Sequence, residues 1–286
     1  MSIAVTAVTG HLGNQIARAL SKAAPNQTVV GLARTPDKAR GLSIEVRPGD
    51  YTAPEQLQKS LAGIDTLLLV SGMAAPDERI QQHRNVINAA KAAGVSKMVY
   101  TSIQGAEEGT AFSPIVQSNR QTEADIRASG LDWAIGRNGI YIEPDIEYIE
   151  TYKAQGEVAN CADSGKCGYT TRPELAYAYA QMLLKPELNG KTYNLHGEAI
   201  TQAQLVEYLN MAFGTKLVYR PLSVADYRTE RMAELGEFVG TIIAGIYEGI
   251  RSGAANNRSD FEAAAGRAHE SWEHYFEQLK LQVQGN

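Results

Sequence analysis

A glycine-bearing turn near the start of the chain has the residue types and spacing to bind a phosphate. The apolar run Ile3–Val5 leads into Thr6-Ala7-Val8-Thr9-Gly10-His11-Leu12-Gly13, after which apolar residues recur at helical spacing. A strand that turns tightly into a helix presents free backbone N–H groups and the positive end of the helix dipole, which favour a phosphate. Glycines let the backbone approach a pyrophosphate closely. We therefore predict a dinucleotide site, with contacts from Thr6, Thr9, Gly10, His11, Leu12 and Gly13.

Ala7 occupies the position at which such a turn carries its first glycine. Gly10 and Gly13 match the last two glycines of a Gly-x-x-Gly-x-x-Gly turn. If φ at Ala7 is positive, its methyl group costs on the order of 1 kcal/mol and crowds the pyrophosphate. If φ is negative, the exchange is nearly harmless, and the sequence leaves both conformations open.

Short β-rich runs alternate with helical patterns from the N-terminus to about Gly139. The runs are apolar enough for burial on both faces, which predicts an α/β fold of Rossmann type, a doubly wound parallel sheet with helices on each side. Ligands then bind beyond the carboxyl ends of the strands. The predicted strands are Ile3–Thr6, Thr28–Ala33, Ile44–Pro48, Thr66–Ser71, Lys97–Ser102 and Asp132–Arg137, and the predicted helices are Leu12–Ala24, Thr35–Leu42, Pro54–Leu61, Gln81–Ala93 and Ile115–Ser129.

The end of the second predicted strand indicates which cofactor the site prefers. An acidic residue there binds the ribose 2′-hydroxyl of NAD, whereas an arginine accepts the 2′-phosphate of NADP. Arg34 follows this strand and Lys38 lies one helical turn later. A solvated basic helix start explains the same two residues, but Arg34 falls where the fold predicts a ligand. The sequence thus favours NADPH over NADH.

The other strand ends supply further candidate contacts for the cofactor. Asp50 has the chemistry to accept from an adenine amino group, although a turn or helix cap is the commoner role for an aspartate there. Small and hydroxyl-bearing residues let a cofactor pass close to the backbone and hydrogen-bond to it. The candidates are Asp50 and Tyr51 after the third strand, Ser71 and Gly72 after the fourth, and Thr101 and Ser102 at the end of the fifth.

The acceptor side of the site is expected after the fifth and sixth strands. Asn138 and Tyr141 follow the sixth strand, and we assign both to the reacting centre together with Asn119. A buried tyrosine bonded to backbone explains Tyr141 equally well. Additional pocket residues are Ile103, Gln104, Phe112 and Ile142, with Phe238 or Tyr247 from the C-terminal part.

The alternation of strands and helices breaks after about residue 140. We expect residues 1–140 to form the NAD(P)-binding domain and residues 141–286 a smaller, mostly helical lobe on the substrate side, partly interleaved with the sheet. The predicted elements are a helix over Glu143–Gln155, a loop over Cys161–Tyr169, a helix capped by Thr170 or Thr171 that runs to Leu184, a strand at Lys191–Leu195, a helix over Thr201–Phe213, a strand near Leu217–Arg220, and mostly helix over Val224–Leu281.

Composition and charge exclude several classes of partner. The net charge of −5 gives no basic footprint for nucleic acid. No apolar run has transmembrane length and no basic-then-apolar leader opens the chain, so we expect a cytoplasmic protein that does not engage a membrane. The spacing of Cys161 and Cys167 fits neither a zinc site nor a redox pair, and the five histidines form no local metal pattern. We expect reduced thiols and no bound metal.

A series of different short motifs extends along nearly the whole chain. Thr6–Gly13 is similar to a Thr-Gly-Ala-Thr-Gly-x-Leu-Gly turn. The later motifs are Gly49-Asp50-Tyr51, His83–Val95, Tyr100-Thr101-Ser102, Thr122-Glu123, Arg137-Asn138-Gly139, Thr171-Arg172 and Gly190–Leu195. By their order and spacing the chain resembles the NmrA-like group of atypical short-chain dehydrogenases.

The resemblance implies an NAD(P)H-dependent oxidoreductase, with two departures in its chemistry. The chain contains no Tyr-x-x-x-Lys pair, so the proton relay of ordinary short-chain dehydrogenases is absent. Close relatives carry a histidine or lysine three residues before the Thr-Glu pair, where this chain has Asn119, which hydrogen-bonds but is neither acid nor base. Hydride transfer to a quinone or another conjugated acceptor requires positioning rather than a strong protein acid. We therefore expect a small quinone-like acceptor.

The resemblance also keeps a second function open. The same group contains redox-sensing regulators that bind NADP without turnover, and the loss of a titratable group at Asn119 suits such a role. The aromatic tail around Trp272–Phe276 packs either on the lobe or on a second subunit, so a monomer and a homodimer both remain open.

Overall fold

The N-terminal half of the computed structural model has the predicted alternation of strands and helices. The structure describes residues 1–39 and 41–285. Each unit of a strand and the helix after it returns the chain to the same edge of the sheet, as parallel pairing requires. The elements are β1 (Ser2–Val5), α1 (His11–Ala23), β2 (Thr28–Ala33), η1 (Pro36–Lys38), β3 (Glu45–Pro48), α2 (Pro54–Ser60), β4 (Thr66–Val70), α3 (Pro76–Ala92), β5 (Lys97–Ile103), α4 (Ser113–Arg127) and β6 (Asp132–Asn138).

The C-terminal half begins with β7 (Ile140–Tyr141) and returns once to the central sheet. Its elements are α5 (Glu143–Glu147), α6 (Ile149–Gln155), β8 (Glu157–Asn160), β9 (Lys166–Thr170), α7 (Arg172–Leu184), η2 (Pro186–Leu188), β10 (Lys191–Leu195), β11 (Ala199–Thr201), α8 (Gln202–Phe213), β12 (Val218–Pro221), α9 (Val224–Leu235), α10 (Glu237–Arg251), α11 (Phe261–Ala265) and α12 (Trp272–Gln284).

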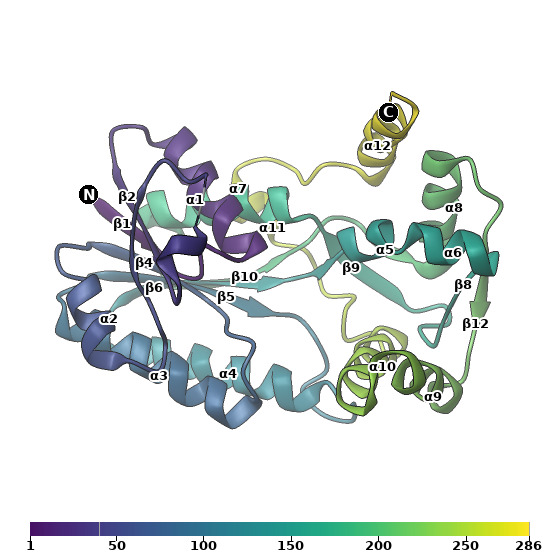
Figure 1. Ribbon diagram of the computed structural model, residues 1–286, viewed down its shortest axis with the longest axis horizontal. Helices are drawn as coiled ribbons and strands as arrows, with labels where there is room; N and C mark the ends of the chain where they lie inside the picture. The colour runs from purple at the N-terminus through teal and green to yellow at the C-terminus, as the bar shows by residue number, and fades with distance from the viewer. Residues whose placement is uncertain (40, 286) are drawn as a thin grey trace.

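A seven-stranded sheet in the order β10-β6-β5-β4-β1-β2-β3 organises the molecule. All of its neighbouring strands pair in parallel. Helices α1, α7 and α11 cover one face and α2, α3 and α4 cover the other, so the Rossmann-type prediction is confirmed (Figure 1). The carboxyl ends of the strands face the C-terminal lobe (Figure 1).

Successive residues of the central strands supply the two faces of the core. In β1, Ile3 and Val5 pack under α1 and α7, whereas Ala4 packs under α2 and α3. This is the two-residue period of a strand that is buried on both sides. The same period in β4 sends Leu68 to the first layer and Leu67 to the second.

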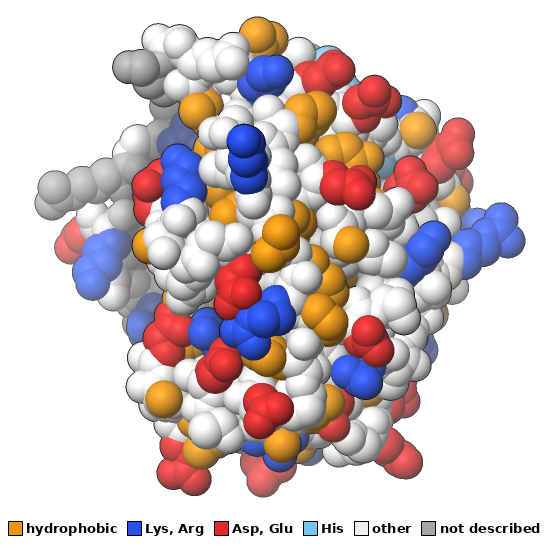
Figure 2. Space-filling model, turned by 90° about the vertical axis from the view of Figure 1, so that its right-hand side faces the viewer, with side chains coloured by type: hydrophobic (Ala, Val, Ile, Leu, Met, Phe, Trp, Pro, Cys, Tyr) orange, Lys and Arg blue, Asp and Glu red, His pale blue; other side chains and the backbone are white. Residues whose placement is uncertain are grey.

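The lobe has its own apolar core and two small sheets. Strands β11, β9 and β7 form one sheet, and β12 pairs with β8 in the other. Side chains from α5, α6, α8, α10 and α12 close the core around Tyr169. On the outer face of this end of the molecule, acidic and basic side chains are interspersed with apolar ones (Figure 2).

Three predicted elements need correction. The expected helix over Thr35–Leu42 is wrong, because only the short η1 forms before Gly41 adopts a positive φ of 78°; Arg40 lies outside the described residues. The helix expected at Gln81–Ala93 begins at Pro76 instead, since a proline fits the first turn of a helix. The loop expected at Cys161–Tyr169 contains most of β9, whose pairing with β11 joins residues more than thirty positions apart.

Other details of the C-terminal half are confirmed. β10 spans Lys191–Leu195 as predicted. Thr171 caps α7, since its Oγ1 accepts from the backbone N–H of Glu174 at 3.2 Å. β10 pairs with β6 in the central sheet, and α7 packs on α1. Residues after position 140 therefore contribute a strand and a covering helix to the N-terminal sheet.

Candidate active site at the carboxyl edge of the sheet

The turn after β1 has the backbone geometry of an anion site. Gly10 is the extended residue before α1, and no described side chain caps the helix. The first N–H groups of a helix have no intrahelical partners. The N–H of Gly10 itself donates to the Ala7 carbonyl at 2.9 Å, which holds the turn closed. The predicted phosphate contacts from His11, Leu12 and Gly13 therefore lie at an open helix start.

Gly13 lets α1 begin directly against the end of β1. A Cβ at this position would lie 2.5 Å from the Ala7 carbonyl oxygen and 2.8 Å from that of Thr6. A Cβ at Gly10 would lie 3.3 Å from the same Ala7 oxygen. The close approach of helix and strand thus requires a glycine at position 13, whereas a Cβ at position 10 would fit tightly.

Ala7 adopts the left-handed conformation, with φ at 52°. This resolves the alternative that the sequence left open: the methyl group stands where a glycine is favoured. For an L-residue that conformation costs about 1–2 kcal/mol.

Replacing Ala7 by Gly is expected to raise the free energy of unfolding by about 0.5–1 kcal/mol, because relief of the strain outweighs the added entropy of the unfolded chain. It should also tighten binding of NADPH. Thermal unfolding and calorimetric titration check both effects. Ala124, an exposed residue within α4, is the control, and Ala124→Gly should destabilise the protein by about 1 kcal/mol. Equal effects of the two substitutions would contradict strain at Ala7.

The hydroxyl groups predicted around the cofactor brace the strand ends. Thr6 Oγ1 accepts from the Val70 N–H at 2.8 Å, and Thr101 Oγ1 accepts from the Ser71 N–H at 2.9 Å. The Tyr51 hydroxyl lies 2.5 Å from Thr6 Oγ1 and 2.8 Å from the Val70 carbonyl oxygen. Thr6 and Tyr51 thus hold β1, β3 and β4 in register at the edge where a cofactor would lie.

The predicted ribose end of the site is exposed and basic. Arg34 and Lys38 both lie on the surface beyond β2. Asp50 is half-buried and its Oδ1 accepts from Thr52 through the backbone N–H at 2.9 Å and the hydroxyl at 2.8 Å. The backbone hydrogen bond from Thr52 and the nearby charge of Arg34 lower the pKa of Asp50. Arg34 is therefore near Asp50, and Asp50 has the turn geometry that the sequence offered as its alternative role.

A buried histidine that the sequence did not select fixes the segment after β4. His83 Nε2 accepts from the Gly72 N–H at 2.9 Å, and its Nδ1 lies 2.9 Å from Thr122 Oγ1. Burial lowers the pKa of His83 to about 3, so the ring is neutral and its proton resides on Nδ1. The sequence motif that begins at His83 drew attention to this segment. It did not identify Gly72 as the partner of the histidine, because Gly72 lies eleven positions earlier.

Asn119 lies beneath the site, with its amide engaged. Its side chain is fully buried. Oδ1 accepts from the Tyr100 hydroxyl at 2.6 Å and from Ser71 Oγ at 3.1 Å, while Nδ2 donates to the Ile115 carbonyl at 2.8 Å. This geometry favours a role in positioning Ser71 over direct contact with an acceptor.

Asn138 and Tyr141 are brought together, as predicted. Asn138 Oδ1 accepts from the Tyr179 hydroxyl at 2.6 Å, and its Nδ2 donates to the Tyr141 hydroxyl at 3.4 Å. Burial raises the pKa of Tyr141, so the phenol stays protonated at neutral pH. Within the described part of the chain its oxygen only accepts, which leaves its proton available to a ligand. The Arg172 guanidinium lies 5.2 Å from the centre of the ring.

Two predicted residues lie away from this group. Ser102 is fully buried and donates to Glu123 Oε1 at 2.7 Å. Phe238 stands on the surface with 70 % of its area exposed. The Ser102 side chain is buried beneath β5 and the Phe238 side chain is exposed on α10, so neither lies beside Asn138 and Tyr141.

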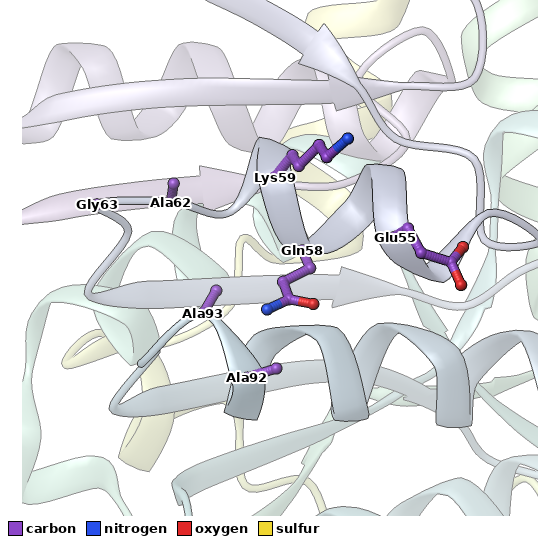
Figure 3. A pocket seen from close by; sticks show the side chains of 7 residues that line it. All are labelled: Glu55, Gln58, Lys59, Ala62, Gly63, Ala92 and Ala93. Carbon is purple, nitrogen blue, oxygen red and sulfur yellow. The ribbon is translucent and has the colours of Figure 1, made fainter.

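An open hollow lies elsewhere on the surface. It has a volume of about 590 Å³ and lies between α2 and α3, lined by none of the predicted site residues (Figure 3). Among residues 1–39 and 41–285, no cluster of three or more His, Cys, Asp or Glu side chains is arranged to hold a metal. Over the same residues, no helix combines the length and the apolar character needed to cross a bilayer. The strand-end residues thus remain the candidate site.

Comparison with known proteins agrees with this geometry. A family model described as NAD(P)H-binding matches residues 8–186. The chain is 36% identical to quinone oxidoreductase 2 of Escherichia coli over 229 residues, which cover 79% of each chain. A crystal structure of the E. coli NADPH-dependent quinone oxidoreductase complexed with NADPH matches with a TM-score of 0.89 and 31% identity, covering 97% of this chain and 99% of that one.

A second solved structure has the same fold over the same length. The triphenylmethane reductase of Citrobacter sp., complexed with NADP(H), matches with a TM-score of 0.88 and 33% identity, covering 97% of this chain and 99% of that one. The strand order and the open helix start after β1 agree with these similarities. The chain belongs to the NAD(P)H-binding family and is an NAD(P)H-dependent oxidoreductase.

Proposed function

We propose that the protein transfers a hydride from NADPH to a quinone-like or similarly conjugated small acceptor. The observation that carries the proposal is the pairing of Asn138 with a protonated Tyr141 at the end of β6, with no Tyr-x-x-x-Lys pair in the chain. Two uncharged hydrogen-bonding groups orient an acceptor without supplying a strong acid. The names of the similar proteins, a quinone oxidoreductase and a triphenylmethane reductase, support the same acceptor class.

The cofactor would lie across the carboxyl edge, from the turn after β1 to the end of β6. The N–H groups of His11, Leu12 and Gly13 and the hydroxyl of Thr9 would hold the pyrophosphate, and Arg34 with Lys38 the 2′-phosphate. Ser71, Gly72 and Thr101 would border its path. The bound cofactor supplies the hydride.

The chain's own contribution to the chemistry is positioning and a proton. Hydride transfer to one end of a conjugated acceptor leaves two electrons in the acceptor and a negative charge on its far oxygen. Tyr141 would donate a hydrogen bond there, and a proton from solvent through Tyr141 would complete the hydroquinone. The conjugation of the acceptor spreads the charge, so no group more acidic than a phenol is needed.

The direct test is NADPH oxidation with a panel of quinones, followed by absorbance and corrected for the uncatalysed reaction. We expect turnover with at least one quinone and a fall in kcat of about 10-fold for Tyr141→Phe. Lys22→Ala, an exposed change at the far end of α1, should leave the rate unaltered. Tight NADPH binding without turnover of any acceptor would overturn the proposal and favour a cofactor-sensing regulator.

The preference for NADPH has its own test. Removing the guanidinium with Arg34→Ala should weaken NADPH binding by about 10–100-fold, because a charge-assisted hydrogen bond to the 2′-phosphate is lost. NADH lacks that phosphate, so its affinity should change little. Calorimetric titration with both cofactors measures the two affinities. Equal losses would contradict recognition of the 2′-phosphate by Arg34.

A further inference from the structure

A thin apolar slot lies beside the candidate site, between the segment after β5 and helix α10. Gly105, Ala106 and Phe112 line it from the segment after β5, and Gly245, Ile246 and Gly249 line it from α10. Ile140, Ala255 and Gln104 complete the lining. Only about 10 Å³ of the slot admits the centre of a water molecule. The slot therefore has room for about one atom the size of a water oxygen, such as a carbonyl oxygen.

Gln104 is the polar group of this slot. Its side chain is 2% exposed, and its Oε1 accepts from Asn257 Nδ2 at 3.0 Å. Its Nε2 has no hydrogen-bond partner among the residues that the structure describes. A buried donor without a partner costs about 1–3 kcal/mol. A ligand that brings an acceptor atom to Nε2 recovers that cost.

The position of Gln104 ties the slot to the reacting centre. The backbone N–H of Gln104 donates to the Asn138 carbonyl at 2.9 Å, and the side chain of Asn138 contacts Tyr141. Ile140, between Asn138 and Tyr141, lines the slot. An acceptor at the end of β6 whose carbonyl oxygen enters the slot would therefore meet Gln104.

Glycines in α10 keep the slot thin and open. A Cβ at Gly245 would lie 2.5 Å from the Phe112 backbone nitrogen, so α10 approaches the segment after β5 as closely as a glycine allows. A Cβ added at Gly249 would have its nearest neighbour in Ala106, at 3.9 Å, so this position borders space rather than a wall. Glycine within a helix costs about 1 kcal/mol relative to alanine. No close contact explains why this helical position is a glycine.

We propose that the slot receives one carbonyl oxygen of a flat conjugated acceptor, with Gln104 Nε2 donating a hydrogen bond to that oxygen. The proposal rests on the proposed function and makes it narrower: it selects acceptors with a carbonyl oxygen over conjugated cations without one. Gln104 is then a catalytic residue, because hydride transfer places negative charge on the oxygen that its N–H contacts.

Two variants and two acceptors test the slot. Gln104→Leu removes the donor at similar volume, and Gly249→Ala adds a methyl group to the slot. The acceptors are 1,4-naphthoquinone, which has carbonyl oxygens, and methylene blue, a conjugated cation without one. In Gln104→Leu, kcat/KM for naphthoquinone should fall by about 10-fold. The Kd of naphthoquinone should rise by about the same factor, measured by equilibrium dialysis with NADP⁺-saturated protein. Methylene blue reduction should stay within about 2-fold, since it makes no such hydrogen bond.

The second variant separates the slot from general damage. Gly249→Ala should raise Tm, because alanine favours the helix, and yet weaken naphthoquinone binding. Gln58→Leu, an exposed change on α2, is the control and should alter neither quantity.

Each failure has a distinct meaning. If the parent protein turns over naphthoquinone and Gln104→Leu leaves its kcat/KM and Kd unchanged, the slot holds water only and the inference is wrong while the proposed function stands. A parallel loss with both acceptors also overturns the inference. If the parent reduces neither acceptor, the proposed function fails, and the inference with it.

Discussion

Glu123→Gln is expected to lower the free energy of unfolding at pH 7 by about 3 kcal/mol, because it removes the buried carboxylate that three partly exposed arginines share. The Glu123 carboxylate is fully buried on α4. It accepts from Arg137 through both oxygens, at 2.8 and 2.7 Å, and from Arg127 at 2.9 Å. Arg120 lies 3.0 Å away. A neutral amide in that place leaves three guanidinium groups without their shared partner.

The pH dependence of this effect has a defined sign. Burial raises the pKa of Glu123, but the hydrogen bond from Arg137 and the charge of Arg120 outweigh it and hold the pKa at about 2. A lowered folded-state pKa adds stability that is complete above the unfolded value of about 4.5 and is lost as the pH falls toward 2. The difference between parent and variant should therefore shrink below about pH 4.5.

Urea unfolding of the parent and the variant between pH 3 and pH 8 measures both quantities. Glu107→Gln is the matched control, because Glu107 also binds Arg120 but has 59% of its side chain exposed. An exposed ion pair contributes about 1 kcal/mol or less. Similar losses for the two substitutions would refute the special role of the buried carboxylate.

Asp145→Asn is expected to stabilise the protein at pH 8 by about 3 kcal/mol, because the parent must keep a charged carboxylate in an apolar lobe. Asp145 is buried at α5, and its Oδ1 accepts from the Tyr152 hydroxyl at 2.9 Å. Burial raises its pKa to about 6. No cation pairs with it among residues 1–39 and 41–285. Burial, together with the charge of Asp145, raises the pKa values of the Tyr169 and Tyr247 hydroxyl groups.

The sign here is opposite to that at Glu123. A carboxyl whose folded-state pKa is raised destabilises the fold progressively as the pH rises from about 4 to about 6, and the loss is constant above that range. The gain from Asp145→Asn should therefore grow by about 2–3 kcal/mol between pH 4 and pH 8. Denaturant unfolding at the two pH values checks it. Asp37→Asn, at an exposed position in η1, is the control, and a pH-independent gain would show that the charge is not the cause.

The sequence predicted those parts of the molecule that depend on local pattern. A run such as Leu67–Val70 in β4 is apolar without interruption and is followed by small residues. This pattern predicts the strand, the parallel sheet and the edge at which a ligand binds. Strands β8 and β9 were missed or misplaced, because Glu157–Asn160 and Lys166–Thr170 are short and gain their pairing from residues far along the chain.

At the site, too, the correct predictions concern residues close together in the sequence, and the missed features depend on residues far apart. The helix start at Gly10 and the contact of Asn138 with Tyr141 join residues that are close in sequence. The occupied amide of Asn119 depends on Tyr100, nineteen positions earlier. The free donor of Gln104 depends on Asn257, 153 positions later. The conformation of Ala7 is decided by the packing of α1 on β1, which no local pattern specifies.

The position of β10 at the edge of the central sheet has a consequence for synthesis of the protein. Translation proceeds from the N-terminus, so β6 (Asp132–Asn138) emerges well before Lys191–Leu195, the strand that pairs with it. During that interval β6 is an open edge with unpaired backbone groups, and an open edge invites pairing with another chain. On a crowded polysome, where identical nascent chains lie side by side, the arrival of β10 removes this risk.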